Sequence, residues 1–172
     1  TPEKISTPTV DNPGDIPSLK ELNIQLQKID ERAVLDFTGG EDAALERLQN
    51  YIWDQDLLQK YKFTRNGLLG ADYSSKFSPW LAVGTLSPRK IYSEVKKYEE
   101  QRKKNISTYW MIFELIWRDF FRFSTLTAGS ELFRAGGVRD INQEWSDDEN
   151  LFERWKKGET GIPFVDANMR EL

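Results

Sequence analysis

Residues 107–124 read STYWMIFELIWRDFFRFS, and this stretch decides the fold class. It is long enough for several helical turns and carries apolar or aromatic side chains on nearly every side. Such a pattern predicts a helix that is buried in the middle of a domain. Because no convincing run of alternating strand residues occurs elsewhere in the chain, we predict an all-α fold.

Helix signals also occur on both sides of this stretch. Apolar residues at helical spacing predict one helix over residues 41–61. The pairs Ser78-Pro79 and Ser87-Pro88 each predict a helix that begins with a serine N-cap. Residues 146–149, SDDE, form a predicted capping box, and residues 161–163, GIP, predict the start of a last helix.

The composition excludes several kinds of chemistry. The 172 residues include no cysteine and no histidine, so disulfides, histidine-assisted nucleophiles and sites with thiolate or imidazole ligands are excluded, and we predict no metal site. The longest apolar stretches, such as residues 109–113, fall far short of the roughly 20 residues that a membrane span needs. We therefore expect an intracellular, soluble protein.

The chain divides into a leader and a helical part. Residues 1–18 contain four prolines among small and polar residues, which predicts an interdomain linker. Residues 19–172 are predicted to form one helical domain. The pattern of its last helix continues to Leu172 without a glycine, proline or polar cap, so we expect a domain that is truncated at its C-terminus.

The segment YSSKFSPW, residues 73–80, is a candidate binding loop. Ser74, Ser75, Lys76 and Ser78 gather at the predicted N-terminus of a helix, where exposed amides and the helix dipole attract anions. An N-cap role explains Ser78 equally well. From these residues alone, a capped turn and a phosphate site both stay open.

A carboxylate inside the apolar helix is the second candidate. Glu114 is costly to bury unless it is paired, and Arg118 stands four residues on, where a helical ion pair can form. Alternatively, Met111, Glu114 and Arg118 share a helix face beside Trp117 and line a pocket for a flat aromatic ligand. The carboxylate would then accept hydrogen bonds from a base edge, and the tryptophan would stack on it.

Three long motifs resemble one family. Residues 61–89, YKFTRNGLLGADYSSKFSPWLAVGTLSPR, resemble the flavin-binding domain of the photolyase/cryptochrome family. Residues 107–123, STYWMIFELIWRDFFRF, and residues 160–172, TGIPFVDANMREL, continue the match in the correct order. The strongest resemblance is to the DASH cryptochromes.

The resemblance implies the N-terminal part of a helical FAD-binding domain and, for the longer protein, light-driven repair of cyclobutane pyrimidine dimers, preferentially in single-stranded DNA. It implies catalytic roles at the dimer for Glu114 and Trp117. It implies DNA contacts by Arg65, Glu114, Trp117 and Arg118. It implies FAD contacts by Tyr61, Ser74, Ser75, Lys76, Phe77, Ser78, Met111 and Arg118. Met111 stands where many photolyases have tryptophan, so its flavin contact departs from the family pattern.

The remaining expectations concern parts outside this chain. A pterin or other antenna would sit on a preceding α/β domain, and other residues of the FAD site would follow Leu172. The segment alone is therefore expected to be inactive. Two alternatives stay open: a blue-light photoreceptor without repair activity, and a helical interaction module that binds no flavin.

Overall fold

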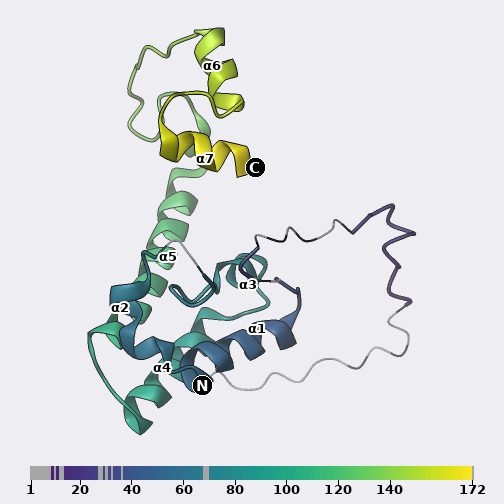
Figure 1. Ribbon diagram of the computed structural model, residues 1–172, viewed down its shortest axis with the longest axis vertical. Coiled ribbons are helices and arrows are strands. Elements are labelled where there is room, and N and C mark those ends of the chain that lie inside the picture. The colour runs from purple at the N-terminus through teal and green to yellow at the C-terminus, as the bar shows by residue number, and fades with distance from the viewer. Residues whose placement is uncertain are drawn as a thin grey trace. The chain divides into compact units, whose positions relative to one another are not determined.

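The computed structural model describes residues 9, 11, 14–26, 29, 31, 33–35, 37–67 and 70–171 (Figure 1). Across these ranges the chain is helical and forms no strand, so the predicted all-α fold is confirmed. The helices are α1 (Glu41–Gln49), η1 (Asn50–Asp54), η2 (Leu57–Lys60), α2 (Tyr61–Thr64), α3 (Ser78–Val83), α4 (Pro88–Gln101), α5 (Ile106–Ala128), η3 (Gly129–Phe133), α6 (Glu149–Lys156) and α7 (Pro163–Glu171).

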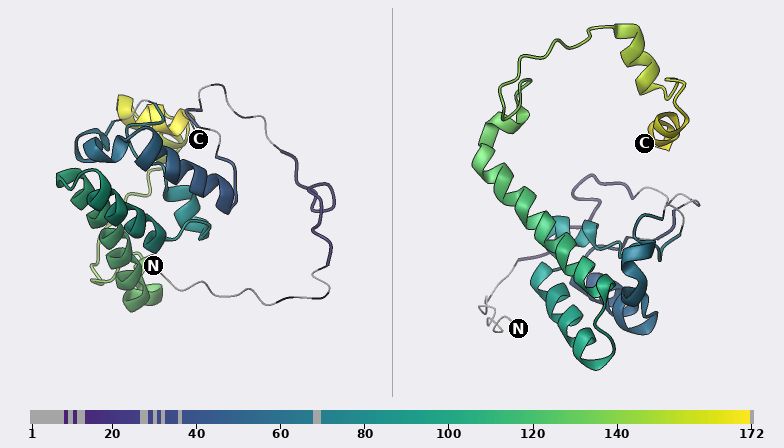
Figure 2. Two further views of the ribbon diagram at one scale, coloured as in Figure 1. Left: turned by 90° about the horizontal axis from the view of Figure 1, so that it is seen from below. Right: turned by 90° about the vertical axis from the view of Figure 1, so that its left-hand side faces the viewer.

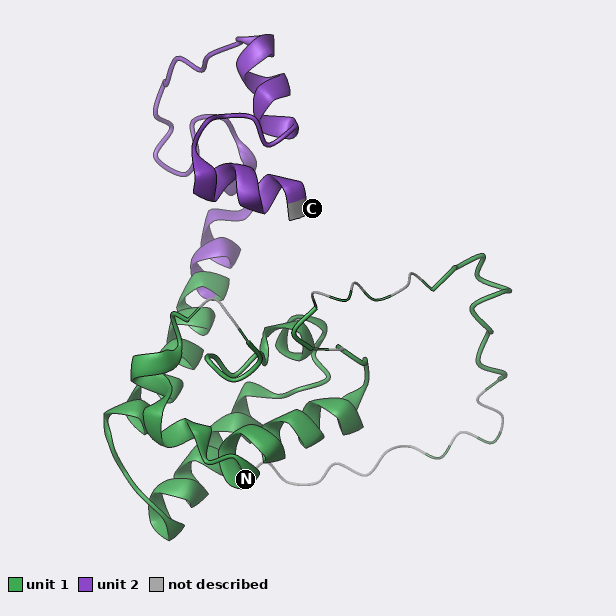
Figure 3. Cartoon of the chain, viewed as in Figure 1, with its two compact units in different colours: residues 1–122 green, residues 123–172 purple. Residues whose placement is uncertain are grey.

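The chain forms two compact units, residues 1–122 and residues 123–172 (Figure 3). Most of the predicted linker, residues 1–18, lies outside the described residues. No helix in the described part of the chain combines the length and the hydrophobicity that a membrane span requires.

The helix predicted over residues 41–61 is broken into four pieces, so that prediction was wrong. α1 passes into the π-helical turn η1, and Asp56 then adopts a left-handed backbone with φ 52°. The Tyr98 hydroxyl donates to Asp56 Oδ1 at 2.6 Å, and Arg102 Nη1 lies 3.3 Å from the same oxygen. Burial, followed by the hydrogen bond to Asp56, raises the pKa of Tyr98. These long-range contacts from the end of α4 hold the break in place.

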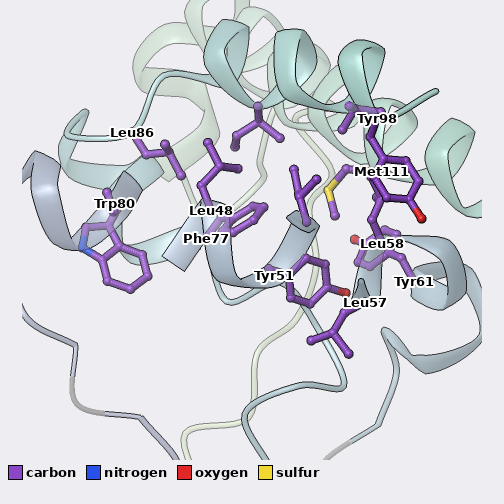
Figure 4. Packing of buried hydrophobic residues seen from close by; sticks show 14 residues of the cluster. Leu48, Tyr51, Leu57, Leu58, Tyr61, Phe77, Trp80, Leu86, Tyr98 and Met111 are labelled. Carbon is purple, nitrogen blue, oxygen red and sulfur yellow. The ribbon is translucent and has the colours of Figure 1, made fainter. Parts of the chain in front are cut away.

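The core of the first unit lies where these pieces meet α3, α4 and the start of α5 (Figure 4). The Tyr51 and Phe77 rings pack edge to face with centroids 5.6 Å apart. Trp80 Nε1 donates to the Thr38 carbonyl at 2.9 Å, which fixes the chain before α1. The buried apolar cluster consists of Ala44, Leu48, Tyr51, Ile52, Leu57, Leu58, Tyr61, Phe77, Trp80, Leu86, Ile91, Val95, Tyr98 and Met111.

The helix predicted to be buried, α5, is buried only near its start. Ser107, Thr108 and Met111 are its buried residues, and its last side chain packed against the core is Leu115. Beyond that point the aromatic side chains are exposed, so the prediction of a helix buried throughout was wrong. The reason is that the apolar residues of α1 to α4 reach only the first turns of α5. Farther along, the rings contact one another instead, as Trp117 does with its neighbours.

The start of α5 is tied to α2. Asn105 Oδ1 accepts from the amides of Ser107 at 2.8 Å and Thr108 at 3.1 Å, and so caps α5. The Asn105 side-chain amide also donates to the Gln59 carbonyl at 2.8 Å. In turn, Ser107 Oγ accepts from the Lys62 amide at 3.1 Å, which satisfies an amide at the start of α2. These hydrogen bonds form a seam that fixes α2 across the first turn of α5. Thr108 Oγ1 donates to Glu99 Oε1 at 2.7 Å and so ties the same turn to α4. Figure 2 shows α4 alongside the first part of α5.

The two predicted serine caps differ in the structure. Ser87 caps α4 as expected, because its side chain accepts from the Arg89 amide at 3.3 Å. Ser78 is the first residue of α3 and makes no capping hydrogen bond, so that prediction was wrong. The physical reason is that Phe77 already has helical angles, φ −78° and ψ −14°. Ser78 therefore lies inside the turn that it was expected to cap.

In the second unit, α6 is capped by Asp148. Its carboxylate accepts from the amides of Asn150 at 3.0 Å and Leu151 at 3.1 Å. The predicted capping box, with Ser146 as the cap, was wrong by two residues, and Ser146 Oγ accepts from the Asp148 amide instead. The predicted helix start near residue 161 is confirmed by α7.

A tight corner joins α6 to α7. Asp166 Oδ1 accepts from the Thr160 amide at 2.8 Å and hydroxyl at 2.6 Å, and Oδ2 accepts from the Gly161 amide at 3.0 Å. These hydrogen bonds, that of the Thr160 side chain first, hold the pKa of Asp166 below its ordinary value. Gly158 has φ +65°, and a Cβ there would lie 2.9 Å from the Asp166 carbonyl oxygen. The corner therefore requires glycine.

Replacing Asn105 by Ala should destabilise the first unit. The change removes an N-cap, worth about 1 kcal/mol in typical helices, and also the tie to the Gln59 carbonyl. Denaturant unfolding of the full-length protein should show a lower midpoint. Asn142→Ala, at an exposed position in the second unit, is the matched control. An unchanged midpoint for Asn105→Ala would contradict the role of the seam.

Replacing Asp166 by Asn should destabilise the protein at neutral pH and progressively less in acid. Because the folded pKa of Asp166 is lowered, its contribution is fully present above the ordinary aspartate pKa of about 4 and is lost as the pH falls through the folded value. The difference in Tm between wild type and variant, measured from pH 7 to pH 3, should therefore shrink. A difference independent of pH would contradict this assignment.

Candidate functional site

One side of the candidate binding loop is held by a buried arginine. Arg47 on α1 is 8% exposed, and its Nε donates to the Ser75 carbonyl at 3.0 Å. Its Nη2 donates to the Ala71 carbonyl at 2.8 Å and lies 3.5 Å from the Ser74 carbonyl. Its Nη1 lies 3.4 Å from Asp72 Oδ1. One guanidinium thus satisfies the carbonyl side of the loop.

The other side of the loop presents donors. Lys76 has a left-handed backbone, φ 59°, and Phe77 follows in the right-handed helical region. Such a pair turns successive amides toward one side and makes a concave site for an anion. Among the described residues, the hydroxyls of Ser74, Ser75 and Ser78 have no hydrogen-bond partner, so they also remain available.

These features fit a diphosphate, although not for the reason expected from the sequence. α3 has six residues, so its dipole is short and adds little to the attraction. The fit depends instead on the turned backbone and on the half-buried hydroxyls and ammonium of Ser74, Ser75 and Lys76. The phosphate interpretation of the loop therefore depends on its backbone conformation, and the cap interpretation of Ser78 was wrong.

Three of the predicted cofactor residues lie in the core. Phe77, Met111 and Tyr61 are 2%, 3% and 7% exposed, respectively, and all belong to the buried cluster (Figure 4). The ring of Phe77 packs on Tyr51, so its backbone is the part left to meet a ligand. Burial, followed by the nearby charge of Glu114, raises the pKa of Tyr61.

Glu114 pairs across helices and not along its own helix. Arg65, directly after α2, donates from Nη1 to Glu114 Oε1. Arg118 pairs with the neighbouring Asp119 at 2.9 Å, so the helical pair with Glu114, one of the two interpretations left open by the sequence, does not form. The seam at the start of α5 explains why Glu114 pairs with Arg65. It brings the end of α2 close to α5, so that the Arg65 guanidinium reaches the Glu114 carboxylate.

The Trp110 ring contacts two cations, Lys62 on α2 and Arg65 directly after it. Lys62 Nζ lies 3.2 Å from the centroid of the Trp110 ring, and Arg65 Cζ lies 4.7 Å from it. Cation–π contacts of this kind are worth about 0.5–2 kcal/mol, the larger values applying where water is excluded. Arg65 Nε is buried and has no hydrogen-bond partner among the described residues. The Arg65 side chain is therefore oriented by Trp110 and Glu114 together.

Trp117 extends this site along α5. It lies three residues after Glu114, on a neighbouring part of the helix surface, and is 40% exposed. The Phe121 ring stacks on it at 5.5 Å with an interplanar angle of 26°, and the Phe113 ring meets it edge-on at 5.9 Å. A carboxylate beside a partly exposed indole can accept hydrogen bonds from a base edge and stack on its face. Among the described residues, Arg118 forms its ion pair with Asp119 and makes no hydrogen bond to Glu114 or Trp117.

Sequence reasoning missed Arg47, Lys62 and Trp110. Arg47 had a recognisable signal, because it falls on the same helical stripe as Ala44, Leu48 and Tyr51, all of which are buried. A cation on an apolar stripe needs acceptors, which predicts a buried partner. Lys62 and Trp110 gave no comparable signal, since their contact depends on how α2 crosses α5.

Comparisons with known proteins agree with this geometry. Residues 110–172 match the family model described as the FAD binding domain of DNA photolyase. The chain is 56% identical over 171 residues to the cryptochrome DASH of Natronomonas pharaonis, covering 99% of this chain and 36% of that protein. It is 61% identical over 143 residues to the cryptochrome DASH of Synechocystis sp., covering 83% of this chain and 29% of that protein.

A solved structure gives the same result. The crystal structure of the Synechocystis sp. cryptochrome matches with a TM-score of 0.82 and 56% sequence identity, over 90% of this chain and 32% of that chain. The chain therefore spans only a minor part of the length of these relatives. The chain belongs to the photolyase/cryptochrome family and carries part of its FAD-binding domain.

Proposed function

We propose that the full-length protein uses FAD and light to repair cyclobutane pyrimidine dimers, preferentially in single-stranded DNA. The observation that carries this proposal is the group on α5, in which Glu114 is paired with Arg65 and stands beside the partly exposed Trp117. The relatives named cryptochrome DASH support it through their similarity over nearly the whole chain.

The cofactor would be held mainly by the loop. Ser74, Ser75, Lys76 and Ser78 supply hydroxyls and an ammonium for the diphosphate, and Arg47 holds the loop from the other side. When bound, FAD supplies the light absorption and the electron chemistry that no side chain of this chain can supply. The buried residues Tyr61, Phe77 and Met111 would then form the apolar floor near the cofactor, and Arg118 stays a proposed contact.

The substrate would be recognised on α5. Glu114 accepts hydrogen bonds from the N–H groups of a pyrimidine edge, and Trp117 stacks on the ring. A damaged base pair costs less to unstack than an intact one, which favours entry of the lesion into the site. Arg65 orients the Glu114 carboxylate before the substrate arrives, and would contact DNA from the same position.

The charge pattern supports a preference for single strands. From Arg89 to Arg122 there are nine lysines and arginines against five acids, which is a modest local surplus in a chain of net charge −4. Binding to duplex DNA depends more strongly on the number of phosphate contacts than binding to a single strand does. A moderate surplus therefore suits a single strand that is also held by stacking on aromatic rings.

Replacing Glu114 by Gln should weaken binding of dimer-containing DNA more than it weakens FAD binding. Loss of a charged hydrogen bond costs about 1.5–3 kcal/mol, or roughly ten-fold or more in affinity. The measurements are the Kd for a single-stranded oligonucleotide with one dimer, the repair yield under blue light, and the flavin content. Glu153→Gln, which changes an ion-paired carboxylate on α6, is the matched control.

Unchanged dimer affinity and repair in the Glu114 variant would contradict the assigned role. If the wild-type protein bound FAD but repaired no dimer, the photoreceptor alternative would replace repair. A wild-type protein without flavin would leave the interaction module as the better account.

Changing the loop should empty the flavin site without unfolding the protein. Ser75→Ala and Ser78→Ala each remove a hydroxyl donor, and Lys76→Glu places a like charge beside the diphosphate. The triple variant should lose flavin absorbance while keeping its helical circular dichroism. Ser87→Ala is the control, because Ser87 is a true N-cap on α4 and lies outside the loop. Full flavin content in the triple variant would mean that the loop does not bind the cofactor.

A further inference from the structure

Arg47 has the bonding pattern of a residue that orients the loop. It is almost completely buried, and burial of a guanidinium is costly unless its N–H groups are satisfied. Among the described residues, all hydrogen bonds of its guanidinium end on the loop, at the carbonyls of Ala71, Ser74 and Ser75 and at the Asp72 carboxylate. The arginine therefore depends on this loop, and the loop depends on the arginine.

The carbonyl contacts determine where the loop amides point. In a planar trans peptide, the carbonyl and the N–H of the following residue point in opposite directions. The Ser74 and Ser75 carbonyls face Arg47, so the amides of Ser75 and Lys76 face away from it. The left-handed backbone of Lys76 continues this orientation into the turn before α3.

We propose that Arg47 is a positioning residue for FAD, which aims the amides of Ser75 and Lys76 at the diphosphate. The inference rests on the proposed function of the loop as the diphosphate site. Arg47 itself lies on the opposite side of the loop and does not touch the phosphates. Its effect on the cofactor is therefore geometric and is not a direct charge contact.

The Arg47→Lys variant separates the effect of side-chain geometry on FAD binding from the effect of positive charge. An arginine presents a planar fork of five N–H donors, which can reach three carbonyls at once, whereas lysine keeps the charge on one flexible ammonium. If geometry is the cause, Arg47→Lys should weaken FAD binding nearly as much as Arg47→Met does. If the positive charge is the cause, lysine should restore binding.

The test uses the full-length apoprotein and FAD. Both Arg47 variants should raise the Kd for FAD by about ten-fold, the equivalent of one lost hydrogen bond to a charged group. Arg154→Met is the matched control, because Arg154 also donates to backbone carbonyls, those of Glu159 and Thr160, but in the second unit. It should lower the Tm of the apoprotein and leave the Kd for FAD unchanged.

A second measurement needs no variant. Hydrogen exchange of the wild-type protein should show that FAD protects the amides of Ser75 and Lys76. Absence of protection at these amides, wild-type affinity in Arg47→Lys, or equal loss of affinity in Arg154→Met would each overturn the inference. Titration of the wild-type apoprotein with FAD separates this inference from the proposed function. If the wild type bound no FAD at all, the proposed function itself would be wrong.

Discussion

The turn at Asp56 is the constraint on which the first unit depends. Its left-handed backbone stops the long helix that the apolar pattern alone would allow, and the Tyr98 hydroxyl and Arg102 hold it there. Without this turn, α1 and α2 would belong to one continuous helix, as the apolar pattern predicts. With it, α1 contacts the candidate binding loop through Arg47, while α2 contacts the start of α5. The two parts of the candidate site depend on this separation.

Each part of the site is built around one arginine and its partners. On α1, Arg47 takes carbonyls from the loop and so turns the donors of the loop outward. After α2, Arg65 takes the Glu114 carboxylate and the face of Trp110. The cost of leaving the buried Arg47 charge unpaired fixes a piece of backbone that a ligand can use. Arg65, whose side chain is 26% exposed, instead orients a carboxylate through an ion pair and a cation–π contact. The cations thus connect the stability of the fold with the geometry of the site.

Local signals in the sequence were enough for part of this structure. The apolar run that became α5, the Ser87 cap and the start of α7 all follow from neighbouring residues, and all are found. The family resemblance rested on three motifs and is confirmed. Ser78 failed as a cap because the conformation of Phe77, one residue earlier, moved the helix start.

The remaining features come from contacts between distant residues. Asp56 and Tyr98 are 42 residues apart in the sequence, and Arg65 and Glu114 are 49 residues apart. No local sequence pattern therefore predicts either contact. The i, i+4 spacing of Glu114 and Arg118 suggested the wrong ion pair for the same reason. Burial of α5 was overestimated because an apolar composition does not say how far its neighbours reach along it. Which residues line a site depends on how the helices cross.

A crystal structure of the full-length protein with FAD bound would show whether the loop held by Arg47 receives the diphosphate. We expect the diphosphate within hydrogen-bond distance of the Ser75 and Lys76 amides, on the side of the loop opposite Arg47. Arg47 should keep its carbonyl contacts. A diphosphate bound elsewhere, or one contacted directly by the Arg47 guanidinium, would rule out this role for the loop.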